Sequence, residues 1–131
     1  MKVFVDNNLP PDLARGLDAL FGNDHEVISH RDKFGLTHIA DEEWIPALGA
    51  EGDWVVLSGD LNIARKRPSR ELFKGARLVG FFPKSAVMEL PLAKKASRIL
   101  FVWDRIERIS NDVRPGMFEL PQRGDRFASL G

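Results

Sequence analysis

Short apolar runs that favour β-strands alternate along this chain with longer stretches of helical periodicity. The strand-like segments are Lys2–Val5, Glu26–Ser29, Trp54–Leu57 and Arg77–Phe82, and the tail from Gly116 to Pro121 predicts a short fifth strand. Apolar residues run without a break through most of the first and third segments. This pattern is typical of strands that are buried on both faces of a parallel sheet.

Three helices are predicted between these strands. The first starts at Pro10 and Pro11 and ends before Gly22, since proline suits a first helical turn and glycine a C-terminus. The second begins at Asp41, a favourable N-cap residue. The third covers residues 92–109 as one amphipathic helix of about five turns. Residues 31–38 are expected to form a polar loop.

The alternation of strands and helices predicts an α/β layer fold with a mainly parallel sheet of four to five strands. The chain has 131 residues, of which 44% are hydrophobic, and this favours one domain over residues 1–131 with one core. The absence of cysteine excludes disulfides, thiolate metal sites and cysteine nucleophiles. The chain has no run of apolar residues long enough for a signal peptide or a membrane span, so we expect a cytoplasmic protein with no membrane partner.

The net charge of zero conceals two halves of opposite sign. Residues 1–60 hold 4 Lys and Arg against 12 Asp and Glu, which gives −8, and residues 61–131 hold 15 against 7, which gives +8. An acidic half attracts cations and a basic half attracts polyanions, so a metal-binding first half and a phosphate-binding second half are one interpretation. The other is that the two halves simply neutralise each other.

Two aspartates follow strands directly. Asp6 ends the first strand and Asp60 comes shortly after Trp54–Leu57, so both belong at the same edge of a parallel sheet, where ligands collect. Asp41 opens a helix that runs against the strands and could start at the opposite edge, and the sequence alone leaves its position open. Carboxylates that converge require a cation, and an all-oxygen site favours Mg²⁺ or Mn²⁺ over Zn²⁺.

Each of these residues also has a purely structural interpretation. Asp6 could cap the helix that begins near Pro10, Asp41 could be only an N-cap, and Asp60 could be a turn residue. The histidines lack metal-ligand spacing and are expected at the surface; they are His25, His30 and His38.

Three motifs resemble those of PIN-like domains. They are Val3-Phe-Val-Asp-Asn-Asn-Leu-Pro10, Ala40-Asp-Glu-Glu-Trp-Ile45 and Val55-Val-Leu-Ser-Gly-Asp-Leu-Asn62, in the order that the family has them. The resemblance implies a three-layer α/β/α fold, a Mg²⁺ or Mn²⁺ site and endoribonuclease activity. It also implies a VapC-type toxin of a toxin–antitoxin pair, which is usually dimeric and is inhibited by a cognate antitoxin.

The resemblance also assigns roles to single residues. Asp6, Asp41 and Asp60 take the places of the metal ligands, and Glu43 that of a fourth acid. Two amides depart from the family pattern, because Asn7 replaces a Glu and Asn62 replaces an Asp, and both lower the negative charge of the site. The supporting residues of the expected site are Asn7, Asn8, Glu42 and Asn62.

The hypothesis that follows is hydrolysis of RNA at these aspartates, with Glu42 or Glu43 orienting the attacking water as a general base. Basic side chains after Asp60 and on the helix over 92–109 are expected to hold the RNA backbone by charge. They are Arg65, Lys66, Arg67, Arg70, Lys94, Lys95 and Arg98.

Three other functions are compatible with the same pattern. A phospho-acceptor receiver domain also has an acid after its first strand and an aspartate after its third, here Asp60, but it needs paired acids where this chain has amides. A non-catalytic module could use the fold to bind RNA or a protein. A deoxyribonuclease could use the same acids, since nothing in the sequence indicates recognition of a 2′-hydroxyl.

Overall fold

A six-stranded sheet with the order β2-β1-β3-β4-β5-β6 forms the centre of the computed structural model, which describes residues 1–131. The strands are β1 (Lys2–Val5), β2 (Glu26–Ser29), β3 (Trp54–Leu57), β4 (Val79–Pro83), β5 (Gly116–Leu120) and β6 (Ala128–Ser129). The first five are parallel, and only β6, which pairs with β5, is antiparallel. The predicted parallel α/β fold is confirmed, with a short sixth strand beyond the four to five expected.

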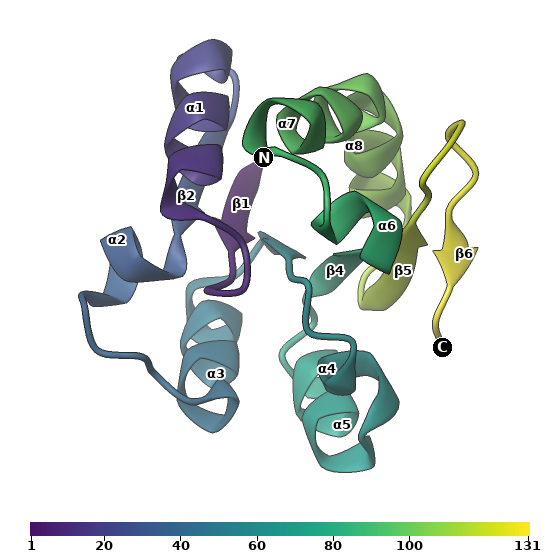
Figure 1. Ribbon diagram of the computed structural model, residues 1–131. Helices are drawn as coiled ribbons and strands as arrows, with labels where there is room; N and C mark the ends of the chain where they lie inside the picture. The colour runs from purple at the N-terminus through teal and green to yellow at the C-terminus, as the bar shows by residue number, and fades with distance from the viewer.

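Helices cover both faces of the sheet and make three layers (Figure 1). They are α1 (Pro11–Phe21), α2 (His30–Phe34), α3 (Asp41–Glu51), α4 (Asn62–Arg65), α5 (Arg67–Gly75), α6 (Ser85–Met88), α7 (Leu92–Phe101) and α8 (Trp103–Asp112). In Figure 1, α1, α7 and α8 lie on one side of the strands, and α3, α4 and α5 lie on the other. None of these helices combines the length and the apolar character that crossing a membrane requires.

The strand residues divide between two apolar cores as the period of two requires. On β1, Val3 and Val5 face the core beneath α1, α7 and α8, whereas Phe4 faces the core beneath α3, α4 and α5. All three side chains are fully buried. Burial on both faces explains why this strand is continuously apolar in the sequence.

Two consecutive crossovers pass over opposite faces of the sheet. The segment from β3 to β4, with α4 and α5, packs on the Phe4 side, and the segment from β4 to β5, with α7 and α8, packs on the Val3 side. Both crossovers step in the same direction along the sheet, so they have opposite hands. A doubly wound receiver fold would keep such steps on one face, so the fold differs from that of a receiver domain.

Two predictions of local structure were wrong. The helix expected over 92–109 is two helices, because the backbone leaves helical geometry at Val102 (φ −99°, ψ 8°). The polar loop expected over 31–38 begins instead with α2, whose N-terminus is capped by Ser29 accepting a hydrogen bond from the Asp32 N–H. Both segments contribute apolar side chains to the cores: Phe34 of α2 packs against the core on the Phe4 side, and Trp103 and Ile106 of α8 are buried on the Val3 side.

A close contact between two helices fixes α3, the helix that begins with Asp41. A Cβ atom built on Gly49 would lie 2.8 Å from the Ala76 Cβ and 3.1 Å from its Cα. Glycine at position 49 therefore allows α3 to approach the end of α5. By contrast, a Cβ on Gly16 in α1 would meet nothing within 4 Å.

We expect Gly49→Ala and Gly16→Ala to change stability in opposite directions. Alanine normally favours a helix by up to about 1 kcal/mol over glycine, so Gly16→Ala should raise the free energy of unfolding by that amount. Gly49→Ala should lower it by about 1–3 kcal/mol, because the methyl group forces the two helices apart. Urea denaturation monitored by circular dichroism measures both changes. Stabilisation by Gly49→Ala would show that the contact is not close.

Candidate metal centre

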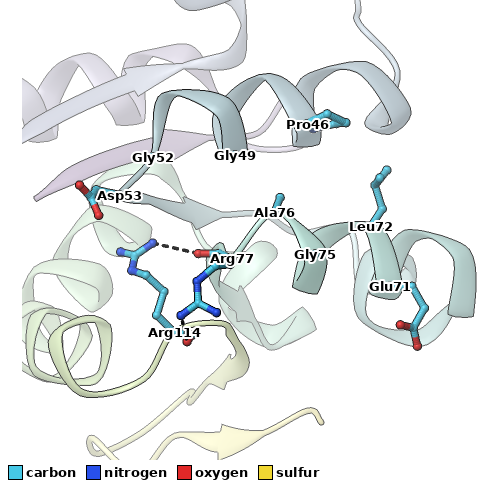
Figure 2. A pocket seen from close by; sticks show the side chains of 10 residues that line it. All are labelled: Pro46, Gly49, Gly52, Asp53, Glu71, Leu72, Gly75, Ala76, Arg77 and Arg114. Carbon is cyan, nitrogen blue, oxygen red and sulfur yellow. Dashed lines mark hydrogen bonds between the residues drawn. The ribbon is translucent and has the colours of Figure 1, made fainter.

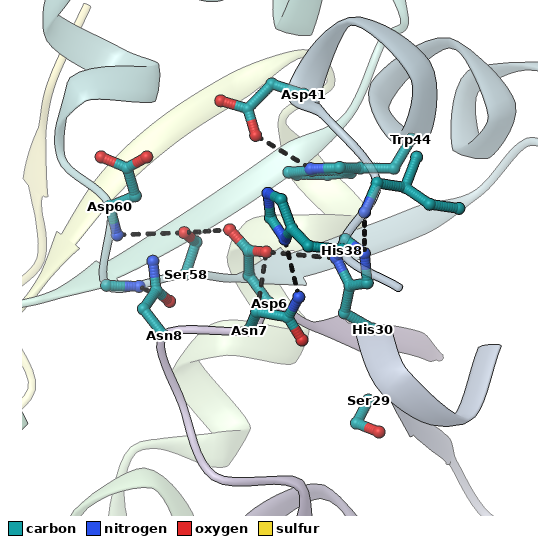
Figure 3. A network of polar contacts seen from close by, with 12 residues as sticks. Asp6, Asn7, Asn8, Ser29, His30, His38, Asp41, Trp44, Ser58 and Asp60 are labelled. Carbon is teal, nitrogen blue, oxygen red and sulfur yellow. Dashed lines mark hydrogen bonds and ion pairs between the residues drawn. The ribbon is translucent and has the colours of Figure 1, made fainter. Parts of the chain in front are cut away.

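A polar pocket of about 470 Å³ lies beyond the carboxyl ends of β1 and β3 (Figure 3). β1 and β3 are neighbours in the sheet, with Val5 paired to Leu57, so the residues that follow them leave the sheet side by side. The pocket is lined by Asp6, Asn7, Asn8, His38, Ala40, Asp41, Glu42 and Asp60. The three aspartates singled out in the sequence therefore line one pocket.

The carboxylate of Asp6 is the most buried acid of the site, with 4% of the residue exposed. Its Oδ1 accepts a hydrogen bond from the Asn7 N–H at 2.8 Å, and its Oδ2 accepts one from the Ser58 hydroxyl at 2.9 Å. The Asp6 N–H itself donates to the Leu57 carbonyl at 2.9 Å, which continues the pairing of β1 with β3. Backbone geometry and side-chain hydrogen bonds thus hold this carboxylate at the floor of the pocket.

Ser58 links Asp6 to Asp60. Its hydroxyl donates to Asp6 and accepts the Asp60 N–H at 3.1 Å, and the Asp60 Oδ1 in turn accepts the Asn62 N–H at 3.0 Å. The neighbouring Gly59 N–H donates to the Asn8 side-chain oxygen at 2.8 Å. The turn after β3 is therefore bonded to the turn after β1. The Asn8 side chain fixes the backbone at Gly59, and the Asn62 N–H orients the Asp60 carboxylate.

Asp41 reaches the pocket because residues 35–40 carry the chain back to the edge where β1 and β3 end. Asp41 is the first residue of α3 and follows the N-cap residue Ala40, so the prediction that Asp41 is the N-cap was wrong. Its Oδ1 accepts a hydrogen bond from the Trp44 indole N–H at 2.9 Å. Burial raises the pKa of Asp41 above its ordinary value, and the charges of Asp6 and Asp60 add to the rise.

His30 is a member of the site that sequence analysis missed, and the expectation that it lies at the surface was wrong. The side chain is fully buried, and its Nδ1 lies 3.5 Å from the Asp6 Oδ1. Burial lowers the pKa of His30, and the charge of Asp6 opposes this shift. One signal in the sequence could have identified it. His30 directly follows the strand β2, which is parallel to β1, so it lies at the same edge of the sheet as Asp6.

The comparison with known families agrees with this architecture. The family described as PIN like domain matches residues 1–85, which contain β1 to β4 and every residue that lines the pocket. The chain belongs to the PIN-like domain family. No characterised protein and no solved structure matches the chain. PIN-like domains are commonly nucleases, so the fold is of a nuclease type, and the membership further disfavours a receiver domain.

The other residues predicted for the PIN-like site lie in different surroundings. Glu42 lines the pocket and is exposed, whereas Glu43 is exposed but does not line it. Arg65, Lys66 and Arg67 are exposed at the junction of α4 and α5, the segment that follows Asp60. Arg70, by contrast, is half-buried in α5.

Two basic residues on α7 take part in the fold. Lys95 is buried, with 7% exposed, so the prediction that it contacts RNA does not fit its position. Arg98 donates hydrogen bonds to the carbonyls of Gln122 and Gly124, which engages its guanidinium within the chain. Only Lys94 is exposed among the three basic residues predicted there.

The carboxylate oxygens that line the pocket of this PIN-like domain suit a hydrated hard cation. No group of three His, Asp or Glu side chains lies close enough to hold one metal ion directly. Mg²⁺, however, usually keeps several waters and binds proteins through one or two carboxylates. The carboxylates of Asp6, Asp60 and Glu42 also add to the rise that burial causes in the pKa of Asp41, so negative charge gathers in the pocket. The pocket therefore fits Mg²⁺ or Mn²⁺ held partly through water.

The largest cavity of the molecule, about 630 Å³, lies elsewhere (Figure 2). It is bordered by Asp53, Arg77 and Arg114, which precede β3, β4 and β5 at the opposite edge of the sheet. There Arg114 donates to the carbonyls of Trp54 and Arg77, and Arg77 donates to the carbonyl of Arg114. These arginines bond backbone carbonyls at the start of the strands, so size alone does not identify the chemical site.

We expect Asp41→Asn to stabilise the metal-free protein at pH 7. The folded pKa of Asp41 lies above the unfolded value, so ionisation costs stability at pH above the folded pKa, and the cost vanishes below the unfolded pKa. Asparagine keeps the acceptor for Trp44 and removes the charge. The gain in the urea midpoint should therefore shrink as the pH falls toward the ordinary Asp pKa of about 3.9.

The matched control for this prediction is Asp24→Asn. Asp24 is exposed in the turn before β2 and makes no side-chain hydrogen bond, so its loss of charge should leave the midpoint nearly unchanged. If Asp41→Asn destabilised the protein at pH 7 and not at acid pH, the electrostatic account of the pocket would be wrong.

Proposed function

We propose that this PIN-like domain is a Mg²⁺- or Mn²⁺-dependent endoribonuclease. The observation that carries the proposal is the convergence of Asp6, Asp41 and Asp60 on one pocket, from three segments far apart in the sequence. Three acids in one polar pocket accumulate negative charge, which a divalent cation neutralises.

Each side chain has a distinct part in the proposed reaction. When bound, the cation orients and activates water and offsets the charge that develops on the leaving oxygen. Asp6 and Asp60 offer the carboxylates nearest to the sheet edge, each oriented by its own hydrogen bonds, and Asp41 faces them across the pocket. Glu42 lines the pocket and is exposed, so it is better placed than Glu43 to take the proton from water.

The exposed basic residues after Asp60 suit the backbone of the RNA. Arg65, Lys66 and Arg67 follow Asp60 by only a few residues and are open to solvent at the end of α4 and the start of α5. Because phosphate contacts are electrostatic, this segment favours nucleic acid without reading its sequence. Lys94 is the one exposed basic residue of the predicted set on α7.

A non-catalytic module that binds RNA or protein is the second candidate. The observation that favours it is the absence of any three acidic or histidine side chains close enough to share a metal ion. A titration with Mn²⁺ separates the two candidates, since a module without metal chemistry should bind RNA equally well with and without the ion.

The central test measures Mn²⁺-dependent cleavage of single-stranded RNA by the Asp6→Asn and Asp60→Asn variants and by the wild type. Both changes keep one side-chain oxygen for the hydrogen bonds from Asn7 and Asn62, so the fold should persist. We expect cleavage to fall by more than the roughly 10–100-fold that loss of an outer-shell partner costs, because an acid of the site itself is removed.

Asp12→Asn is the matched control for this test, since Asp12 is exposed on α1 and pairs only with Arg15. It should cleave like the wild type. A DNA strand of the same sequence, assayed in parallel, distinguishes a ribonuclease from a general phosphodiesterase. Undiminished cleavage by both site variants would refute the mechanism.

We extend the proposal to a toxin that is held inactive by a cognate antitoxin and that forms a homodimer. The sequence motifs support this setting, since the resemblance to PIN-like domains that they carry also suggests a VapC-type toxin. Leu36 supports a protein contact near the pocket, because it is 81% exposed on the segment between α2 and α3. Leu36 comes two residues before His38, which lines the pocket, so an antitoxin segment that bound Leu36 would lie beside this part of the site.

Induced expression of the wild-type chain in a bacterial host should therefore slow growth. The Asp60→Asn variant, expressed to the same level by immunoblot, should not, because the toxicity is expected to require the acids of the pocket. Growth curves and total RNA integrity measure the effect. Equal growth inhibition by the variant would separate any toxicity from cleavage.

A further inference from the structure

Two stacked histidine rings lie beside the acidic pocket, and the proposed metal chemistry uses neither of them. The ring centroids of His30 and His38 lie 5.2 Å apart with an interplanar angle of 15°. His30 is fully buried, whereas His38 is exposed and lines the pocket. The inner ring therefore lies against the core, and the outer ring faces the space where a substrate would bind.

One hydrogen bond of His38 indicates which of its nitrogens carries a proton. The Asn7 side-chain Nδ2 donates to the His38 Nδ1 at 2.8 Å, so Nδ1 is the acceptor and Nε2 carries the proton. No other hydrogen bond involves this ring. Figure 3 shows the His38 ring between Asp6 and Asp41, within the group of side chains that lines the pocket. Nε2–H is thus an unused donor at the site.

The same geometry argues against His38 as a metal ligand. A neutral imidazole has one nitrogen lone pair available to a metal, and in His38 that lone pair accepts the hydrogen bond from Asn7. His38 is therefore suited to donate to an anion and not to bind a cation. The charged side chains of the lining are carboxylates, which repel phosphate.

His30 fixes the segment that carries His38. Its Nε2 accepts the Ile39 N–H at 3.2 Å, so the backbone next to His38 is bonded to a buried ring. Aromatic neighbours confine that ring: the centroids of Phe4, Phe34 and Trp44 lie 5.6, 5.4 and 6.4 Å from it.

The second nitrogen of His30 faces the acids. With Nε2 as an acceptor, the neutral ring carries its proton on Nδ1, which lies 3.5 Å from the Asp6 Oδ1 and has no other partner. His30 thus connects the floor of the pocket at Asp6 with the segment before Asp41. The two nitrogens perform separable tasks, and different substitutions can test them.

We propose that His38 donates a hydrogen bond from Nε2 to a non-bridging oxygen of the scissile phosphate, and that His30 is the residue that positions His38. The inference rests on the proposed nuclease function and adds a substrate contact to it. The donor does not depend on the charge of the ring, because Nε2 carries a proton both in this tautomer and in the imidazolium form.

The first experiment compares His38→Ala with His38→Gln. Glutamine offers an amide N–H near the position of Nε2, and alanine offers none. Binding of a fluorescent single-stranded RNA is measured by anisotropy in the Asp60→Asn background, so that cleavage does not interfere. We expect His38→Ala to weaken RNA binding about tenfold, as the loss of a hydrogen bond to a charged group does, and His38→Gln to recover part of the loss. Equal RNA affinity of all three proteins would overturn the proposal.

The Mn²⁺ affinity of the His38 variants separates this contact from the metal site. It is measured without RNA, in proteins that retain Asp60. His38→Ala should bind Mn²⁺ as the wild type does, and it should lose kcat/KM for cleavage. If His38→Ala lost Mn²⁺ affinity as strongly as Asp6→Asn, His38 would be a ligand and the proposal would be wrong. The two proposals can also fail separately. If the wild-type protein bound RNA through His38 but neither bound Mn²⁺ nor cleaved, the nuclease function would be wrong and the phosphate contact would still hold.

The second experiment tests the positioning role of His30 with a matched pair. Glutamine at position 30 keeps an acceptor near Nε2 for the Ile39 N–H, whereas asparagine keeps a donor near Nδ1 for Asp6. We expect His30→Asn to lower RNA affinity while it retains Mn²⁺ binding, and His30→Gln to retain RNA affinity while Mn²⁺ binding falls about 10–100-fold. Parallel losses of both affinities in both variants would indicate a merely structural residue and overturn the assignment.

Discussion

A buried carboxylate without a cation beside it is the constraint on which the site depends. Asp6 is almost inaccessible to solvent, and no Lys or Arg pairs with it. Its charge is supported instead by a backbone N–H, a serine hydroxyl and the nearby imidazole of His30. Donors held this rigidly keep the carboxylate oriented while leaving its charge uncompensated, which suits a group that receives a cation.

The same carboxylate organises the elements around it. The Asn7 N–H and Ser58 fix the turns after β1 and β3, and His30 fixes the end of β2 and the approach to α3. These three strands are neighbours in the sheet, in the order β2-β1-β3. The sheet order thereby brings residues from positions 6 to 60 to one edge, and the central position of β1 makes Asp6 their common point.

The sequence was sufficient for the features that depend on local pattern. The strands before Asp6 and Asp60 follow from their apolar runs, and a parallel sheet then places both acids at one edge. The position of Asp41 was not determined, because it depends on the path of residues 35–40 and not on the periodicity of α3. His30 could not be assigned from its neighbours in the chain, since its burial arises from packing against Phe4 and Trp44. The break at Val102, whose side chain is buried in the core, interrupts an amphipathic pattern that is continuous in the sequence.

A side chain from the second half of the chain covers part of the acidic site. The side chain of Met88, in α6, lies so close to Gly59 that a Cβ atom at position 59 would collide with it. Gly59 precedes Asp60, so a residue beyond the end of the family match at position 85 covers the turn that presents an acid. Recombination between relatives that exchanged the chain after residue 85 would therefore leave this turn uncovered unless the new segment also supplied a side chain that reaches Gly59.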